Sequence, residues 1–137
     1  MSAFIQSESP SNVRLMQRLP KDDYDQLVAA SDVGLIFLDH RFTIPNFPSR
    51  MLNYMQARLP VLACTDSNTD IGKVIQDGEF GWWCESDDVD GFGNSLELIS
   101  EANLTEAGEN GFEYLKVHYS VECCYKTIEE KMKCLVS

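Results

Sequence analysis

The residues best suited to chemistry lie between residues 44 and 54, in the run IPNFPSRMLNY. Two prolines stiffen the first half of this run and push the residue before each of them away from helical geometry. A helix is predicted to begin abruptly at Ser49. The backbone N–H groups of its first turn lack partners, and the helix dipole adds partial positive charge there. Such an end suits an anion, in particular a phosphate.

Arg50 adds a full positive charge to this first turn. The helix dipole favours an acid at this place, so an arginine needs another reason to occupy it. A bound anion would supply that reason; the alternative is that Arg50 points into solvent or pairs with Asp39. Asn53 lies one turn further along the same face. Its amide suits sugar hydroxyls, although an ordinary surface asparagine would look the same.

The charge distribution favours an anion site in this part of an otherwise acidic chain. The 137 residues carry a net charge of −11, which argues against nucleic acid or anionic lipid as a partner. Residues 1–60 hold equal numbers of acidic and basic side chains, so the whole excess lies in residues 61–137. Two differently solvated faces would give the same asymmetry. The stretch from residue 40 to 58 contains no acid and three arginines, Arg41, Arg50 and Arg58.

The five cysteines indicate reduced thiols rather than a disulfide framework or a zinc site. Their number is odd, none forms a C-x-x-C pair, and neither histidine lies close to two of them. No apolar leader is present at the start, and the longest apolar run, residues 33–38, is far too short to span a bilayer. We therefore expect a cytoplasmic protein with no metal site and no transmembrane segment.

Other candidate side chains have simpler explanations. Asp22 and Asp23 are better explained as helix N-capping residues than as paired catalytic carboxylates, and the same holds for Asp66 and Asp70. The adjacent tryptophans at 82 and 83 face opposite sides of a strand, so core packing is favoured over stacking on a sugar. The chain contains no P-loop, dinucleotide fingerprint or H-E-x-x-H motif.

The elements that position these residues alternate between strands and helices. Apolar runs predict strands at residues 13–19, 33–38, 60–64 and 80–84, of which the second is typical of a strand covered on both faces. A helix from Asp23 to Ala30 is expected to be capped by Asp23, and Asn103 with Glu106 forms a capping box. Further helices are predicted from residue 49, from a cap at Thr69 or Asp70 to Gly78, and over 88–100, 104–118 and 121–135.

This alternation predicts a parallel, doubly wound α/β sheet, because parallel neighbouring strands need crossover connections. The length fits one compact domain. Ligands of such sheets bind outside the carboxyl ends of the strands. The segments that follow residues 19, 38, 64 and 84 are therefore the places to look for a site.

A specific order of motifs runs along residues 12–133: LPKDDYDQL, ASDVGLIFL, PSRMLNY, LPVLA, DIGKVIQDGEFGW and AGENGFEYLKVHYS. In this order they resemble the C-terminal, nucleotide-sugar-binding domain of family 4 glycosyltransferases with the GT-B fold. The resemblance implies a Rossmann-like parallel sheet flanked by helices, with a helical C-terminal extension. Residues 1–137 would form a single partial domain of that kind.

The resemblance also implies a retaining transferase that moves a sugar from a nucleotide-diphosphate donor to an acceptor, commonly in surface-polysaccharide assembly. Cationic side chains and a helix N-terminus would stabilise the departing diphosphate without a metal. The diphosphate would be held by Ser49, Arg50 and the backbone N–H groups of Met51 and Leu52. Asn53 falls at the ribose position. The base would meet Gln17, Arg18 and Leu19, and the sugar would lie beside Pro45, Asn46 and Phe47.

The chain departs from the family pattern in two respects. Pro45 and Asn53 stand where the family has paired glutamates, although an asparagine can still bond hydroxyls. The upstream strands that carry basic residues, and the N-terminal domain that would bind a glycan or lipid-linked acceptor, have no counterpart here. We therefore expect a piece of a longer enzyme, at the cytoplasmic side of a membrane, that binds donor weakly and transfers no sugar alone. The alternative is a non-catalytic α/β module that binds a ligand or a protein.

Overall fold

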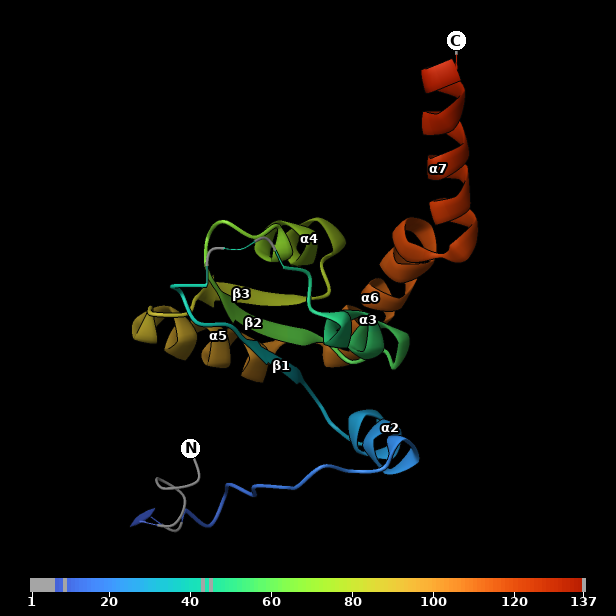
Figure 1. Cartoon of the computed structure of the whole chain (residues 1–137). Helices are drawn as coiled ribbons and strands as arrows, with labels where there is room; N and C mark the ends of the chain where they lie inside the picture. The colour runs from blue at the N-terminus through green and yellow to red at the C-terminus, as the bar shows by residue number, and fades with distance from the viewer. Residues whose placement is uncertain (1–6, 9, 43, 45, 137) are drawn as a thin grey trace.

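The centre of the molecule is a three-stranded parallel sheet in the order β1 (Gly34–Phe37), β2 (Val61–Thr65) and β3 (Gly81–Glu85). The computed structural model describes residues 7–8, 10–42, 44 and 46–136. Helices join and flank the strands (Figure 1): α2 (Lys21–Ala29), α3 (Ser49–Gln56), α4 (Ile71–Gly78), α5 (Val89–Glu101), α6 (Leu104–Tyr119) and α7 (Val121–Val136). This confirms the predicted α/β class with a Rossmann-like parallel sheet and a helical C-terminal extension.

The central strand β2 is buried along its whole length. Val61 and Ala63 join a core cluster with buried side chains of α3 and α4, whereas Leu62 and Cys64 pack with Cys84 and with apolar residues of α5. Successive strand residues point to opposite faces. Helices α3 and α4 therefore cover one face of the sheet, and α5 covers the other (Figure 1).

The edge strand β1 differs from its predicted environment. Its continuous apolar run predicted burial on both faces, yet Leu35 and Phe37 are 43% and 54% exposed while Ile36 is fully buried. The reason lies in the packing of α5, which contacts β3 at the far edge of the sheet. Phe37 lies beside Phe92 of α5, with 5.8 Å between ring centroids, but remains half exposed. Only one face of β1 is thus covered, and the two-sided prediction is wrong.

The predicted strand at residues 13–19 is also wrong, because this segment has no regular secondary structure. Val13, Leu15 and Met16 remain 44–53% exposed. The segment runs well away from the sheet before it enters α2 (Figure 1). Alternating apolar residues favour a strand only where a neighbouring strand completes the backbone hydrogen bonds, and this segment pairs with none in the described structure.

The predicted N-terminal caps of two helices, α2 and α6, differ in outcome. Helix α2 begins at Lys21 rather than at Asp23, with Pro20 at the N-cap, and no side chain of the described residues caps it. The carboxylate of Asp23 therefore acts only through its charge near the positive helix end. Asn103 is confirmed as the N-cap of α6, since its Oδ1 accepts a hydrogen bond of 3.3 Å from the Glu106 backbone N–H, and the Glu106 carboxylate accepts one of 3.2 Å from the Asn103 side-chain amide.

Helices α3 and α6 meet at a close backbone approach. Arg58, just after α3, adopts a left-handed conformation with φ of 55°. Its guanidinium pairs with Glu109 at 2.8 Å and lies 3.9 Å from the centre of the Phe112 ring. A Cβ atom at Gly108 would lie 2.1 Å from the Arg58 carbonyl oxygen, so only glycine fits at this contact.

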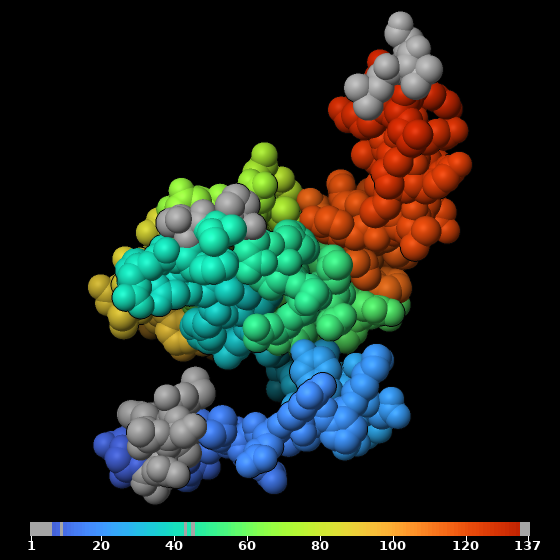
Figure 2. All heavy atoms as spheres, viewed as in Figure 1, coloured from blue at the N-terminus to red at the C-terminus, as the bar shows by residue number. Residues whose placement is uncertain are grey.

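The last helix, α7, stands clear of the body in the space-filling view (Figure 2). Val121, Tyr125, Ile128 and Met132 recur along one of its faces and are 60–80% exposed. The helix therefore adds little to the core. No described helix is both long enough and apolar enough to cross a membrane.

Cys64 and Cys84 are register partners on β2 and β3, and both side chains are buried. Their sulfur atoms lie 3.4 Å apart, and all five cysteines are free thiols. Burial, followed by the neighbouring Cys84 thiol, raises the pKa of Cys64 to about 12. The thiolate is thus disfavoured inside the sheet.

The close contact between Gly108 and the Arg58 carbonyl predicts that alanine substitutions at two helical glycines change the free energy of unfolding in opposite directions. Gly108→Ala should lower the free energy of unfolding by about 1–3 kcal/mol, because the added methyl forces the Arg58 carbonyl away. Gly93→Ala meets no atom within 4 Å and should raise it by about 0.5–1 kcal/mol, the helix propensity difference. Urea unfolding followed by circular dichroism measures both. If both substitutions stabilised the protein equally, Gly108 would not be in close contact with the Arg58 carbonyl.

The raised pKa of Cys64 predicts that the free energy of unfolding decreases at alkaline pH. The unfolded chain releases the thiol proton near pH 9, whereas the folded chain keeps it until about pH 12, so stability should fall as pH rises through this window. Urea unfolding at pH about 8 and about 10.5 should show a smaller loss for Cys64→Ala than for the unaltered chain. Cys124→Ala, which removes an exposed thiol, is the matched control and should leave the loss unchanged.

Candidate functional site

Helix α3 begins at Ser49, as predicted, and divides sharply into two faces. Met51 and Met55 are fully buried against the sheet. On the other side Ser49, Asn53 and Gln56 are exposed, at positions i, i+4 and i+7 of one helix face. We call these three residues the polar stripe. It runs from the N-terminus of the helix to its last turn.

The first turn of α3 offers fewer free amides than the sequence suggests. Pro48 occupies the N-cap in an extended conformation and has no N–H of its own. The Met51 N–H already donates a hydrogen bond of 2.9 Å to the Pro48 carbonyl, so a phosphate would have to compete for it. The Leu52 side chain packs against the core, which directs this residue inward. Ser49 and Arg50 remain the most accessible residues of the turn.

Two of the three arginines between residues 40 and 58 are held in ion pairs. Arg41 binds both carboxylate oxygens of Asp39, at 2.9 and 2.7 Å, and holds the pKa of that carboxyl well below its usual range. Arg58 is paired with Glu109 at the opposite end of α3. Asp39 is therefore not the partner of Arg50. Within the part of the chain that the structure describes, no carboxylate forms a salt bridge with Arg50.

Tyr54 connects this turn to the sheet and to α2. Its hydroxyl donates a hydrogen bond of 3.4 Å to the Leu35 carbonyl, and its ring lies directly against Gly34. Burial raises the pKa of Tyr54; the nearby Tyr24 hydroxyl raises it further, and the Arg50 guanidinium opposes the shift. Tyr24 packs against the core cluster that includes Tyr54, which places α2 against α3.

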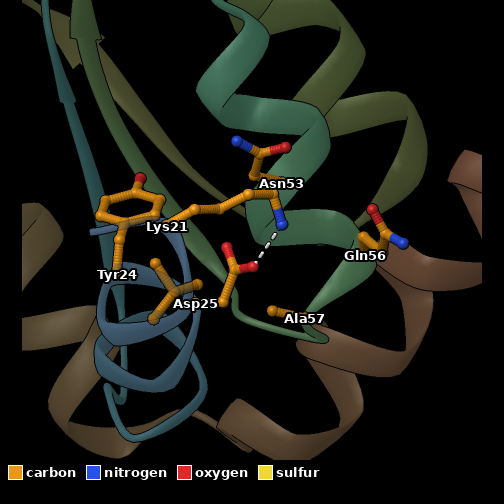
Figure 3. A pocket seen from close by; sticks show the side chains of 7 residues that line it. Lys21, Tyr24, Asp25, Asn53, Gln56 and Ala57 are labelled. Carbon is orange, nitrogen blue, oxygen red and sulfur yellow. Dashed lines mark hydrogen bonds and ion pairs between the residues drawn. The ribbon is translucent and has the colours of Figure 1, made fainter. Parts of the chain in front are cut away.

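A cleft of about 450 Å³ lies between α2 and α3 (Figure 3). Helix α2 lines it with Lys21, Tyr24, Asp25 and Val28, and the opposite wall consists of Asn53 and Gln56 of α3 with the C-cap residue Ala57. The Lys21 ammonium pairs with Asp25 at 2.6 Å, and this contact raises the pKa of Lys21. The cleft therefore combines a phenol ring, two amides and a neutralised ion pair.

Of the residues selected from sequence, Asn53 is the one that lines this cleft. Gln17, Arg18 and Leu19 lie in the irregular segment before α2 and do not line it. The sequence alone does not indicate Tyr24 or Gln56 as site residues. The spacing of Gln56, seven positions after Ser49, was a signal that could have identified it, but nothing local indicated that α2 would lie opposite.

The loop before α3 is attached to the C-terminal helices. The Phe47 ring lies 5.5 Å from the ring of Tyr119 at the end of α6, centroid to centroid. Asn46 is exposed, and Pro45 lies outside the described residues. The structure thus shows a specific support for the Phe47 part of the loop, next to the first turn of α3.

The other candidates have structural roles. Trp83 donates a hydrogen bond of 2.9 Å to Thr65 Oγ1 and packs on the core, while Trp82 packs on the opposite face. Asp66 accepts a hydrogen bond of 2.8 Å from the Asn68 N–H. Among the described residues no group of three or more His, Cys, Asp or Glu side chains is arranged to hold a metal ion.

Comparison with known proteins provides one relative. The probable glycosyltransferase WbjE of Pseudomonas aeruginosa is 26% identical over 125 residues. The chain is related to a glycosyltransferase. The alignment covers 91% of this chain but only 30% of that relative, so the chain spans less than a third of the relative's length. No family model and no solved structure matches the chain.

The contact between Phe47 and Tyr119 can be measured by a double-mutant cycle. The two rings should be coupled by about 0.5–1.5 kcal/mol, the usual contribution of an aromatic pair beyond its buried area. Urea unfolding of Phe47→Leu, Tyr119→Leu and the double variant gives this coupling. Additive effects of the two single substitutions would show that the loop is not held by α6.

Proposed function

We propose that this chain is the donor-binding part of a retaining glycosyltransferase of family 4 with the GT-B fold. The whole enzyme would transfer a sugar from a nucleotide-diphosphate donor to a glycan or lipid-linked acceptor, in surface-polysaccharide assembly. The observation that carries the proposal is Arg50, a cation without a carboxylate partner among the described residues at a helix start with no acid. The relationship to a glycosyltransferase supports the same conclusion.

In this proposal the donor diphosphate lies at the first turn of α3. Ser49 and Arg50 bind it, together with the backbone N–H groups at Leu52 and at Met51, where the phosphate replaces the Pro48 carbonyl as acceptor. An arginine forms strong, charge-assisted hydrogen bonds to phosphate oxygens. The same groups stabilise the negative charge that develops on the diphosphate as the sugar departs, because they are fixed in place before the reaction. No metal is required for this step.

The remaining contacts extend along α3 and its flanking segments. Asn53 bonds the ribose hydroxyls, to which its amide can both donate and accept. Gln17, Arg18 and Leu19 lie on the side of the base, immediately before α2. Asn46, Phe47 and Pro45 lie on the side of the sugar, and the contact of Phe47 with Tyr119 supports this loop.

The acceptor would be bound by the rest of a longer enzyme, in the cytoplasm at the membrane surface. The alignment with the relative leaves about two thirds of that protein without a counterpart in this chain. Domains of about 100–200 residues are the usual unit for a separate binding function. The 137-residue chain itself would thus bind donor weakly and transfer no sugar.

The diphosphate site predicts a specific effect of Arg50. In NMR titrations, uridine or guanosine diphosphate should shift the amide signals of Ser49 to Asn53 and of Gln17 to Leu19. Arg50→Ala should weaken this binding by about 1.5–3 kcal/mol, roughly ten- to 150-fold, because it removes a charge-assisted phosphate contact.

Arg41→Ala is the matched control, since it removes an equal charge from an arginine already paired with Asp39. It should leave the affinity nearly unchanged. Equal losses from the two substitutions would indicate only a general charge effect. Shifts confined to other regions, or none at millimolar ligand, would favour a non-catalytic α/β module.

A further inference from the structure

We propose that the cleft between α2 and α3 is the nucleoside end of the donor site. In this arrangement Tyr24 supplies a stacking face for the base, and Gln56 reads the edge of the base through its amide. The inference rests on the proposed function and extends it to residues that neither the sequence motifs nor the similar protein assign. It depends on three features of the structure: the order of groups along α3, the distribution of charge, and the walls of the cleft.

The polar stripe on α3 has the same order as the parts of a nucleoside diphosphate. At a rise of 1.5 Å per residue, Asn53 lies about 6 Å and Gln56 about 10 Å beyond Ser49 along the helix axis. All three side chains share one exposed face. A diphosphate at Ser49 thus places the ribose beside Asn53 and the base beside Gln56. Asn53 belongs both to the stripe and to the cleft, so the two are continuous.

The charges along this path change in the same order. Arg50, at the diphosphate end, has no carboxylate partner among the described residues, whereas Lys21 in the cleft is neutralised by Asp25 at 2.6 Å. The helix dipole also favours negative charge at the first turn only. A dianionic group is therefore favoured at Ser49, and a neutral group such as a nucleoside is favoured in the cleft.

The cleft has the size and lining of a small-molecule site. Its volume of about 450 Å³ falls within the usual range for such sites, about 300–1,000 Å³. Val28 and Ala57 add apolar surface between the polar groups. The amides of Asn53 and Gln56 each offer donors and an acceptor, which is the pattern that the edge of a base requires.

Tyr24 is held in place to act as a wall. Its ring is partly buried against the core cluster, and its backbone N–H donates a hydrogen bond of 3.0 Å to Pro20 in the first turn of α2. In the close view Tyr24 and Asn53 approach the cleft from the two helices (Figure 3). A fixed aromatic face stacks on any base, because every base has a π-face.

Three probes separate the two ends of the site in NMR titrations of the 137-residue chain: inorganic pyrophosphate, uridine diphosphate and guanosine diphosphate. All three should shift the amides of Ser49 and Arg50. Only the nucleotides should shift the Tyr24 ring protons and the side-chain amide of Gln56. Tyr24→Leu, which keeps apolar volume without a flat ring, should weaken nucleotide binding roughly five- to 150-fold and leave pyrophosphate binding unchanged.

Further variants distinguish stacking from a structural role of the residue. Tyr24→Phe keeps the ring and should retain nucleotide affinity, whereas Gln56→Met keeps the length of the side chain and should weaken binding of the nucleotides only. Gln26→Ala, on α2 but outside the cleft lining, is the matched control and should bind all three probes as the unaltered chain does. Amide spectra of each variant report whether the fold is intact.

The outcomes for the cleft and for the proposed function are separate. If nucleotides and pyrophosphate give the same shifts, confined to the first turn of α3, the nucleoside assignment is overturned and the diphosphate site stands. Unchanged nucleotide affinity in both Tyr24→Leu and Gln56→Met has the same meaning. If none of the probes shifts Ser49 or Arg50, the proposed function itself is overturned.

Discussion

Burial of β2 on both faces is the constraint on which the rest of the structure depends. Four of its five residues are in register with both neighbouring strands, and each face meets a different set of helices. Because neighbouring strands are parallel, every connection must cross from the carboxyl end of one strand to the amino end of the next. Helix α3 is such a crossover, so its N-terminus lies at the carboxyl edge of the sheet, where α/β proteins bind ligands.

The candidate site follows from how α3 meets this sheet. Met51 and Met55 fix its rotation by burying one face completely, which leaves the polar stripe exposed. The contacts at the C-terminal end of α3, where Arg58 and Gly108 meet, fix where it ends against α6. Ion pairs also limit which cation is available between residues 40 and 58: Arg41 and Arg58 are paired with carboxylates, whereas Arg50 forms no salt bridge with a described carboxylate.

The donor site we propose therefore uses a rigid helix on one side and a more peripheral one on the other. Helix α3 orders the contacts from diphosphate to base, while α2 closes the cleft through Tyr24. Phe47 links the loop before α3 to Tyr119, far along the chain. In our proposal this site binds the donor, and the acceptor side lies on other parts of a longer protein.

The sequence by itself determined the elements with strong periodicity, from the strand after Pro60 to the final helix, and the start of α3 at Ser49. It also selected Arg50 and Asn53 as candidates for the site, because helix-end chemistry and i, i+4 spacing are local properties. Only the tertiary structure decided that residues 13–19 form no strand and that β1 is covered on one face, since both depend on which neighbours are present. The sequence also did not determine which arginine pairs with Asp39 or that Tyr24 lies across the cleft from Asn53. Contacts between separate elements cannot be deduced from the spacing of residues within one element.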